Sequence, residues 1–317
     1  MKDFEYVNAK TLDEAVSALS ASNSFIIAGG TDVIGWMKDE ILPEYPDALV
    51  NLKTISPSLD YIKEEGGMLK VGALTRIEDI AVNPTIRGKY TALAEAAHRT
   101  ASPHIREMGT IGGNICQLNR CWYFRSADNR FHCRRKGGRK CFAITGDNRY
   151  HSIFGGNRGC MAVNPSDTAP ALVALDATII TSAGRSIRAE DFWKVKIPKS
   201  TVLEDGEIVV EIQVPEPAAG VKSSFIKFAL RKSIDFPIVN CAAAIGGGTT
   251  RICLNAVHNN PYRATRAEKF ISSKKINEAN AEAAGDAAVQ GSTALSMNKW
   301  KIQIARVMVK KAILACA

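Results

Sequence analysis

The most distinctive chemistry in this sequence is a group of cysteines. Five of the eight lie between residues 116 and 160, and Cys121, Cys133, Cys141 and Cys160 are separated by 11, 7 and 18 residues. Four thiolates can ligate a cubane 4Fe–4S cluster or a tetrahedral zinc ion. Structural zinc usually shows close C-x2–4-C pairs, so this spacing favours the cluster without excluding zinc. We predict that these four bind the metal and that Cys116 is a packing residue.

The same segment holds most of the net charge. The chain has 41 Lys and Arg against 32 Asp and Glu, a formal net charge of +9, and residues 120–160 contribute ten basic and two acidic side chains, or +8. A 4Fe–4S centre with four thiolates is anionic, so nearby cations lower the cost of burying it. The surplus either guides an acidic electron carrier or is a solvated charged loop. His132 and His151 are predicted to be ordinary polar loop histidines rather than partners of cluster sulfur.

Two glycine pairs form a second candidate site, at residues 28–32 (AGGTD) and 110–114 (TIGGN). Paired glycines let backbone N–H groups approach a pyrophosphate closely, and a following helix N-terminus adds favourable partial charge. Each pair alone is typical of an ordinary turn. Neither matches the three-glycine dinucleotide fingerprint.

Regular elements surround these motifs. Thr11 with Glu14, and Thr75 with Glu78, match helix capping boxes, and Ser166 is a predicted helix N-cap. The periodicity predicts strands at 24–28, 48–52, 68–73, 177–181, 208–214, 223–230, 239–245 and 251–257, and helices at 91–99, 166–175, 263–273, 276–290 and 298–315. The last helix carries Trp300 and Met308 on an apolar face, with lysines opposite. Residues 116–162 lack periodicity, and a loop of that length is uncommon unless something organises it.

Composition narrows the class of protein. Apolar residues make up 46% of the 317, which permits a packed core. The N-terminus lacks the apolar run of a signal peptide, and no stretch reaches the roughly 18 apolar residues of a membrane span. We therefore expect a protein with no membrane segment, cytoplasmic, with its thiols reduced.

Five stretches together resemble a known family. AGGTD at 28–32, ASPHIREMGTIGGN at 101–114 and NPSDTAPALVALDA at 164–177 are similar, in this order, to the FAD-binding subunit of xanthine dehydrogenase-type molybdenum hydroxylases. The likeness continues through FIKFALRKSIDFPIVN at 225–240 and NAVHNNPYRATRAE at 255–268. The resemblance implies an α+β fold with a two-lobed FAD-binding domain at 1–184. A small parallel lobe covers 1–55, and a larger mixed or antiparallel lobe covers 56–184 with an insertion at about 116–162. A C-terminal domain, an antiparallel sheet with helices, follows at 185–317.

The resemblance also implies roles for individual residues. The first glycine loop would hold the FAD diphosphate through Ala28, Gly29, Gly30, Thr31, Asp32, Val33, Ile34 and Gly35. The second FAD-binding loop would comprise Thr110, Ile111, Gly112, Gly113 and Asn114, with Thr100, Ser102 and Gln117 nearby. Asp167 would approach ribityl or adenosine hydroxyls, or else cap a helix. Lys227 would lie near the isoalloxazine ring, or else be an exposed strand lysine. Catalytic residues on this chain are unknown.

The cysteine segment resembles a subset of that family. RCWYFR at 120–125, the spaced cysteines and the returning PSDTAPAL are similar to the FAD subunit of 4-hydroxybenzoyl-CoA reductase, which holds a 4Fe–4S cluster there. This implies an electron-transfer subunit that works with a separate 2Fe–2S small subunit and a molybdopterin-binding large subunit. An external carrier, a ferredoxin or NAD, would exchange electrons with it. Electron flow could run inward, as in that reductase, or outward to NAD, as in xanthine dehydrogenase.

A different class of function also fits some of these residues. A basic zinc loop with interleaved aromatic rings could bind nucleic acid by stacking, using Trp122, Tyr123, Phe124 and Phe131. The resemblance, which spans nearly the whole chain, argues against this and predicts no nucleic-acid partner.

Overall fold

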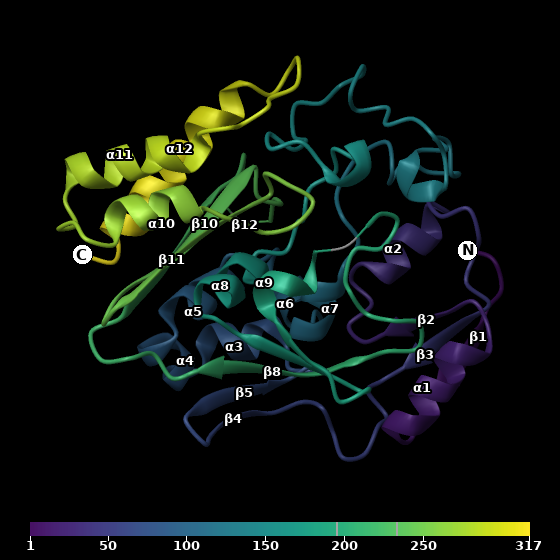
Figure 1. The fold of residues 1–317 in the computed structure, drawn as a ribbon. Helices are drawn as coiled ribbons and strands as arrows, with labels where there is room; N and C mark the ends of the chain where they lie inside the picture. The colour runs from purple at the N-terminus through teal and green to yellow at the C-terminus, as the bar shows by residue number, and fades with distance from the viewer. Residues whose placement is uncertain (195, 233) are drawn as a thin grey trace.

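Three β-sheets form the framework of the chain. The computed structural model describes residues 1–194, 196–232 and 234–317. One sheet lies near the N-terminus, one in the middle and one beneath the C-terminal helices (Figure 1). This arrangement agrees with the predicted α+β class. Within the described residues, no helix is both long and apolar enough to span a bilayer.

The N-terminal lobe is a small parallel sheet with two helices. Strands β1 (Glu5–Asn8), β3 (Ala48–Asn51) and β2 (Ser24–Ile27) lie in that order, and both pairings are parallel. Helix α1 (Leu12–Ala21) begins at the predicted capping box: Thr11 Oγ1 accepts from the Glu14 amide at 3.1 Å. Helix α2 (Val33–Lys38) follows the first glycine pair. The β2–α2 connection therefore lies where a parallel sheet offers its strand ends to a ligand.

The middle lobe is built on an antiparallel sheet. Its strand order is β4 (Ile62–Glu65), β5 (Met68–Gly72), β8 (Val209–Pro215), β6 (Thr178–Thr181) and β7 (Ser186–Arg188). The helices of this lobe are α3 (Ile77–Val82), α4 (Pro84–Lys89), α5 (Thr91–His98), α6 (Pro103–Arg106), α7 (Ile111–Cys116), α8 (Thr168–Ala174) and α9 (Ala189–Phe192). One hydrophobic core joins the sheet to these helices. Strands β7 and β8 complete the sheet although they follow residue 184.

The C-terminal sheet is covered on both faces. Strands β12 (Tyr262–Arg263), β11 (Thr249–Asn255), β10 (Val239–Gly246) and β9 (Lys222–Phe228) are antiparallel in that order. Along β10, Cys241 and Ala243 pack against α10 (Thr265–Ile271), α11 (Glu278–Val289) and α12 (Trp300–Leu314), while Ala242 and Ala244 join the middle core. Small alternating side chains let helices approach both faces of the strand.

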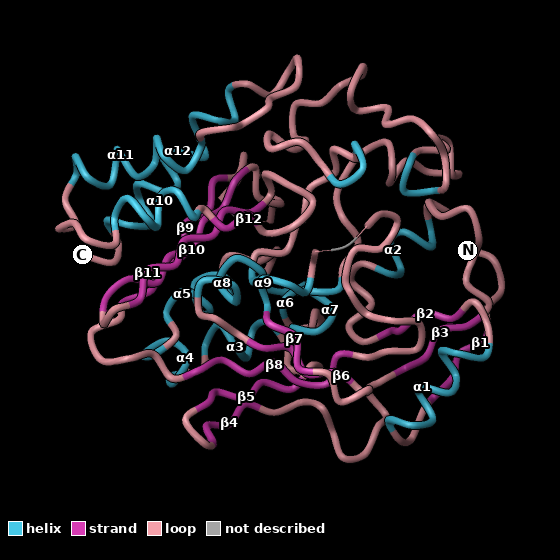
Figure 2. The backbone as a smooth tube through the Cα atoms, in the orientation of Figure 1, coloured by secondary structure: helices cyan, strands magenta, loops and turns pink. Residues whose placement is uncertain are grey.

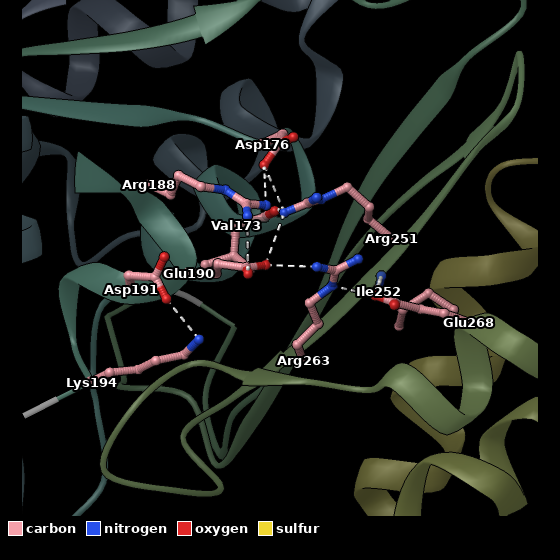
Figure 3. Close-up of polar contacts among 10 residues, drawn as sticks. All are labelled: Val173, Asp176, Arg188, Glu190, Asp191, Lys194, Arg251, Ile252, Arg263 and Glu268. Atoms are coloured by element: carbon pink, nitrogen blue, oxygen red, sulfur yellow. Dashed lines mark hydrogen bonds and ion pairs between the residues drawn. The ribbon is translucent and has the colours of Figure 1, made fainter. Parts of the chain in front are cut away.

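Ion pairs connect the middle lobe to this sheet (Figure 3). The Glu190 carboxylate on α9 accepts from Arg263 at 2.6 Å and from Arg251 at 3.3 Å. Arg251 also pairs with Asp176 at 2.9 Å, and Arg263 with Glu268 at 2.9 Å. Two arginines from β11 and β12 thus bind carboxylates contributed by both parts of the molecule, which fixes the sheet against the middle lobe.

The cysteine segment is a long loop, as predicted. Between α7 and α8 the described chain has only two short 3-10 turns, Arg134–Lys136 and Asn157–Gly159 (Figure 2). In Figure 1 this loop lies between α2 and the C-terminal helices. It therefore contacts elements from both ends of the chain.

Candidate cofactor sites

The two glycine turns converge, although 77 residues lie between them. A Cβ atom on Gly29 would lie 1.9 Å from the Met108 carbonyl oxygen and 3.0 Å from the Cα of Gly109. A Cβ on Gly109 would in turn lie 3.5 Å from the Thr31 hydroxyl oxygen. Only glycine at position 29 permits this approach, so the first turn is seated on the backbone that leads into the second.

The first turn presents unused backbone donors. Within the described part of the chain, the amides of Gly29, Gly30, Thr31 and Asp32 donate no hydrogen bond. Gly30 has φ +72°, a conformation that L side chains rarely adopt. Consecutive free N–H groups at a strand-to-helix turn form a cradle suited to a phosphate or diphosphate. Val33 and Ile34 pack into the small core of this lobe, and Gly35 is exposed.

The second turn is largely satisfied by the chain itself. Thr110 Oγ1 accepts from the Gly113 amide at 3.2 Å and so caps α7. The amides of Ile111 and Gly112 donate to carbonyls of the β5–α3 connection, and a Cβ on Gly112 would lie 2.8 Å from the Ala73 oxygen. Gly113 alone is exposed. The glycines of this turn therefore let another backbone segment approach closely, but the turn leaves few amide donors free for a ligand.

Asp32 connects the first glycine turn to the cysteine segment. Its carboxylate pairs with Arg120 at 2.8 Å and with Arg125 at 2.9 Å, and it accepts from the Leu118 amide. Burial would raise the pKa of Asp32, but Arg125 and Arg120 outweigh it and hold the pKa below its usual value. The predicted role of Asp32 at the cofactor is thus joined by a structural one: it holds residues 118–125 against the turn.

Several other predicted cofactor residues hydrogen-bond within the chain. The Asn114 side-chain oxygen accepts from Ser166 at 2.6 Å and from Thr168 at 2.7 Å. Gln117 donates to the Asn114 carbonyl. Thr100 Oγ1 donates to a helix carbonyl, and the Ser102 hydroxyl accepts from the Ile105 amide at the start of α6. These contacts bring residues 114, 117 and 166–168 together.

Asp167 and Lys227 form a buried pair. Their side chains are 4% and 3% exposed, and the carboxylate lies 2.7 Å from Nζ. The Asp167 side chain makes no capping hydrogen bond, since Ser166 accepts from Ala169 instead. Both simpler roles, a capping aspartate and an exposed lysine, are therefore excluded. Burial raises the pKa of Asp167, and Lys227 and Asn240 oppose that rise.

Two polar residues near this pair were not predicted. Asn240 donates to Asp167 at 2.7 Å, while its own oxygen is buried with no partner among the described residues. The Arg99 Nε is likewise buried and unpartnered, and the Arg99 carbonyl accepts from Lys227. A polar residue inside the apolar strand VNCAAAI was the available signal for Asn240. Unsatisfied buried polar atoms are typical of a site that a ligand completes.

The four predicted ligand cysteines line one cavity. Cys121, Cys133, Cys141 and Cys160 line it together with Phe124 and other loop residues. Cys116 does not line it and packs against the middle core, as predicted. Among the described residues, no three Cys, His, Asp or Glu side chains converge tightly enough to hold a single metal ion.

Basic groups surround this cavity. Lys136 is 5% exposed, and its ammonium has no hydrogen-bond partner among the described residues. Arg134 and Arg135 line the cavity, and each leaves a buried Nε without a partner in that same part of the chain, while their Nη1 atoms donate to nearby oxygens. Burial raises the pKa of the Cys121 thiol to about 12, so a thiolate there needs positive charge beside it. Four thiols with these basic groups beside them fit an anionic group bound through sulfur.

His151 contradicts its predicted role as an ordinary polar loop histidine. It is buried, and its Nε2 lies 3.1 Å from Cys121 Sγ, whereas His132 is exposed as predicted. Burial and the Lys301 ammonium lower the pKa of His151 to about 4, so the ring is neutral. Asn259, which was not predicted, donates to the Ala162 carbonyl at 2.7 Å and lies 3.8 Å from Cys160 Sγ.

Comparison of the chain with known proteins identifies its family. Residues 2–217 match the model of the FAD binding domain in molybdopterin dehydrogenase, and residues 224–316 match that of the CO dehydrogenase flavoprotein C-terminal domain. The chain belongs to this FAD-binding family. The prediction of a flavoprotein component of a molybdenum hydroxylase, and hence of an oxidoreductase subunit, is confirmed at this level.

Relatives of this FAD-binding subunit span nearly its whole length. It is 33% identical to the aldehyde oxidoreductase FAD-binding subunit PaoB of Escherichia coli K12, over 86% of this chain and 87% of that protein. The glyceraldehyde dehydrogenase medium chain of Sulfolobus acidocaldarius is 29% identical, over 87% and 83%. A solved carbon monoxide dehydrogenase from Hydrogenophaga pseudoflava superposes with a TM-score of 0.76 at 28% identity, covering 99% of this chain and 97% of that one. The last comparison confirms the predicted fold class.

Proposed function

We propose that this FAD-binding subunit relays electrons between FAD and a 4Fe–4S cluster held by Cys121, Cys133, Cys141 and Cys160. When bound, FAD exchanges electron pairs and an iron–sulfur cluster carries single electrons, so the two together link one-electron and two-electron chemistry. The observation that carries the proposal is the convergence of four cysteines on one cavity, beside a buried lysine whose ammonium has no hydrogen-bond partner among the described residues.

The FAD half rests on the family and on the first glycine turn. The free amides of residues 29–32 would hold the diphosphate, with Thr31 beside them. The remaining contacts that we assign, Ala28, Val33, Ile34, Gly35, Thr100, Ser102, Thr110, Ile111, Gly112, Gly113, Asn114, Gln117, Asp167 and Lys227, are proposals on the same basis. The buried Lys227 would set a cation against negative charge on the cofactor.

The cluster is favoured over zinc by the arrangement of the thiols. One zinc ion draws its sulfur ligands into van der Waals contact with one another, whereas a cubane spaces them around a larger core. The four cysteines share a cavity without forming a single-ion group among the described residues. Either centre, bound by four thiolates, is anionic and would pair with Lys136, so the lysine supports an anionic metal centre of either kind.

The partners that we propose follow from the relatives and from the charge of the chain. The relatives are named as an FAD-binding subunit and a medium chain, so we infer a 2Fe–2S small subunit and a molybdopterin-binding large subunit as partners. Exposed basic side chains near the cavity, Arg130, Arg139, Lys140 and Arg158, favour an acidic one-electron carrier such as a ferredoxin over NAD. This matches the 4-hydroxybenzoyl-CoA reductase type. Assays of the purified complex with 4-hydroxybenzoyl-CoA plus a low-potential dye, and with xanthine plus NAD, separate the two directions.

Two substitutions test the assignments independently. Cys133→Ser should remove most of the iron while leaving FAD bound, because residue 133 belongs to neither glycine turn. Gly29→Ala should do the reverse, because the new Cβ collides with the Met108 carbonyl and displaces the diphosphate cradle. Iron, acid-labile sulfide and flavin are measured on each purified protein.

Matched variants control for general damage. Cys116→Ser removes a thiol outside the cavity, and Gly88→Ala adds a methyl group where no atom lies within 4 Å. Both should keep iron and flavin at wild-type levels. If Cys133→Ser and Gly29→Ala lower stability but neither loses its own cofactor selectively, the assignments are wrong.

A further inference from the structure

His151 is the best-placed donor to a ligand sulfur. Its Nε2 lies 3.1 Å from Cys121 Sγ, and its Nδ1 is buried with no partner among the described residues. A neutral imidazole carries one N–H, and a metal-bound thiolate can only accept. Once Cys121 binds metal as a thiolate, the proton of the neutral ring belongs on Nε2, the nitrogen that faces the sulfur. The rings of Trp122 and Tyr123, centred 5.9 and 6.1 Å away, flank the imidazole.

The C-terminal domain holds this histidine in place. Lys301, on α12, is fully buried, and its ammonium donates to the carbonyls of Tyr150, His151 and Ala256 at 3.1, 3.1 and 2.5 Å. All three ammonium protons are thereby used. Asn298 adds a bond from its amide to the His151 carbonyl at 3.1 Å. The backbone of residue 151 is thus fixed from an element 150 positions further along the chain.

We propose that His151 tunes the cluster by donating a hydrogen bond to the Cys121 sulfur, with Lys301 as the residue that positions it. This inference rests on the proposed cluster. A hydrogen bond to a ligand sulfur withdraws negative charge and favours the reduced, more anionic state. The reduction potential is therefore higher with His151 than without it. The sulfur of Cys121 also becomes electronically distinct from the other three.

The test uses the reduced, cluster-containing protein. His151→Leu should shift the cluster midpoint potential, measured by EPR-monitored redox titration, to a more negative value. His151→Gln keeps an amide donor and should shift it less. The matched control is His132→Leu, which removes an exposed histidine adjacent to ligand Cys133 and should leave the potential unchanged.

A second measurement needs no substitution at the site. In wild-type protein labelled with ¹⁵N-histidine, pulsed EPR of the reduced cluster should show a nitrogen coupling that persists in His132→Leu. Lys301→Met should weaken this coupling and lower the potential, whereas Lys311→Met, at an exposed position of α12, should not.

The outcomes distinguish this inference from the proposed function. Wild-type protein without iron and sulfide would refute the cluster and with it the tuning. A cluster that shows no histidine coupling, or the same potential in His151→Leu as in wild type, would overturn the tuning alone. If His151→Leu assembles no cluster, the histidine nitrogen coupling in the wild-type protein tests the tuning: its presence supports the hydrogen bond and its absence refutes it.

Discussion

Lys136 is the single residue that most directly indicates what the cysteine cavity holds. Its ammonium is buried without a hydrogen-bond partner in the described part of the chain, and burial lowers its pKa. A buried cation of this kind is costly unless an anion is beside it. In the iron-free protein, Lys136→Met should therefore raise the free energy of unfolding by about 1–2 kcal/mol. In the cluster-loaded protein the same change should lower it and speed iron loss.

The experiment is informative because the effect on the free energy of unfolding is expected to have opposite signs in the iron-free and the cluster-loaded protein. Chemical denaturation of both forms gives the two free energies, and Lys140→Met, at an exposed position of the same loop, should change neither by more than about 0.5 kcal/mol. A Lys136→Met protein that is less stable with and without iron would show that the lysine serves the fold alone.

The role of a residue could be predicted from the sequence where that role depends on residue type and spacing. Cys121, Cys133, Cys141 and Cys160 were singled out by density, and the structure brings them to one cavity. His151 and Lys301 could not be predicted, because their roles depend on burial. The apolar stripe of the last helix assigned its lysines to solvent, yet Lys301 is fully buried among backbone carbonyls.

At the scale of elements, the ion pairs between α9 and the C-terminal sheet determine how the lobes meet. Glu190 is 17% exposed and pairs with Arg188, Arg251 and Arg263, whereas its neighbour Asp191 is 47% exposed and pairs with Lys194 (Figure 3). Glu190→Gln should lower the free energy of unfolding by about 2 kcal/mol, because the amide keeps an acceptor oxygen but removes the negative charge that Arg251 and Arg263 share. Asp191→Asn should cost less than about 0.5 kcal/mol.

Comparing these two neighbouring variants separates the effect of the interface from that of helix α9, on which both residues lie. Urea denaturation measures both, and equal losses would mean that the ion pairs contribute nothing specific to the junction. Helix α8 and strand β10 lie at the same junction. Asp167 immediately precedes α8 and Asn240 lies on β10, so we expect Glu190→Gln to weaken flavin retention as well.

Elements were predictable where a local signal and the tertiary structure agree. Thr11 caps its helix as predicted, although the Glu14 carboxylate accepts from the Lys10 amide and not from that of Thr11. The Thr75–Glu78 box was wrong: Thr75 bonds to the Tyr61 backbone, and α3 begins after Arg76 without a side-chain cap. The sequence pattern is present, but the Thr75 hydroxyl hydrogen-bonds to the backbone of Tyr61 and does not cap the helix. The domain division at residue 184 stays a prediction, and the pairing of β6 with β8 argues for a division nearer β9.

At the scale of the whole molecule, the cysteine loop connects the two ends of the chain. Asp32 in the N-terminal lobe binds Arg120 and Arg125 at its start, and Lys301 in the C-terminal helix binds the carbonyls of Tyr150 and His151 near its end. A loop with so little regular structure is held by these polar contacts and, in our account, by the cluster itself. Asp32 lies in the first glycine turn, so the same contacts keep the two candidate cofactor sites in a fixed relation.

The composition of the purified chain tests this account most directly. Iron, acid-labile sulfide, zinc and flavin are quantified per polypeptide, and Mössbauer spectroscopy identifies the iron centre. We predict about four iron and about four sulfide in one cubane cluster, as four cysteine ligands in one cavity require, together with one FAD. Stoichiometric zinc without sulfide, or a flavoprotein whose loop binds no iron after anaerobic purification, would contradict it.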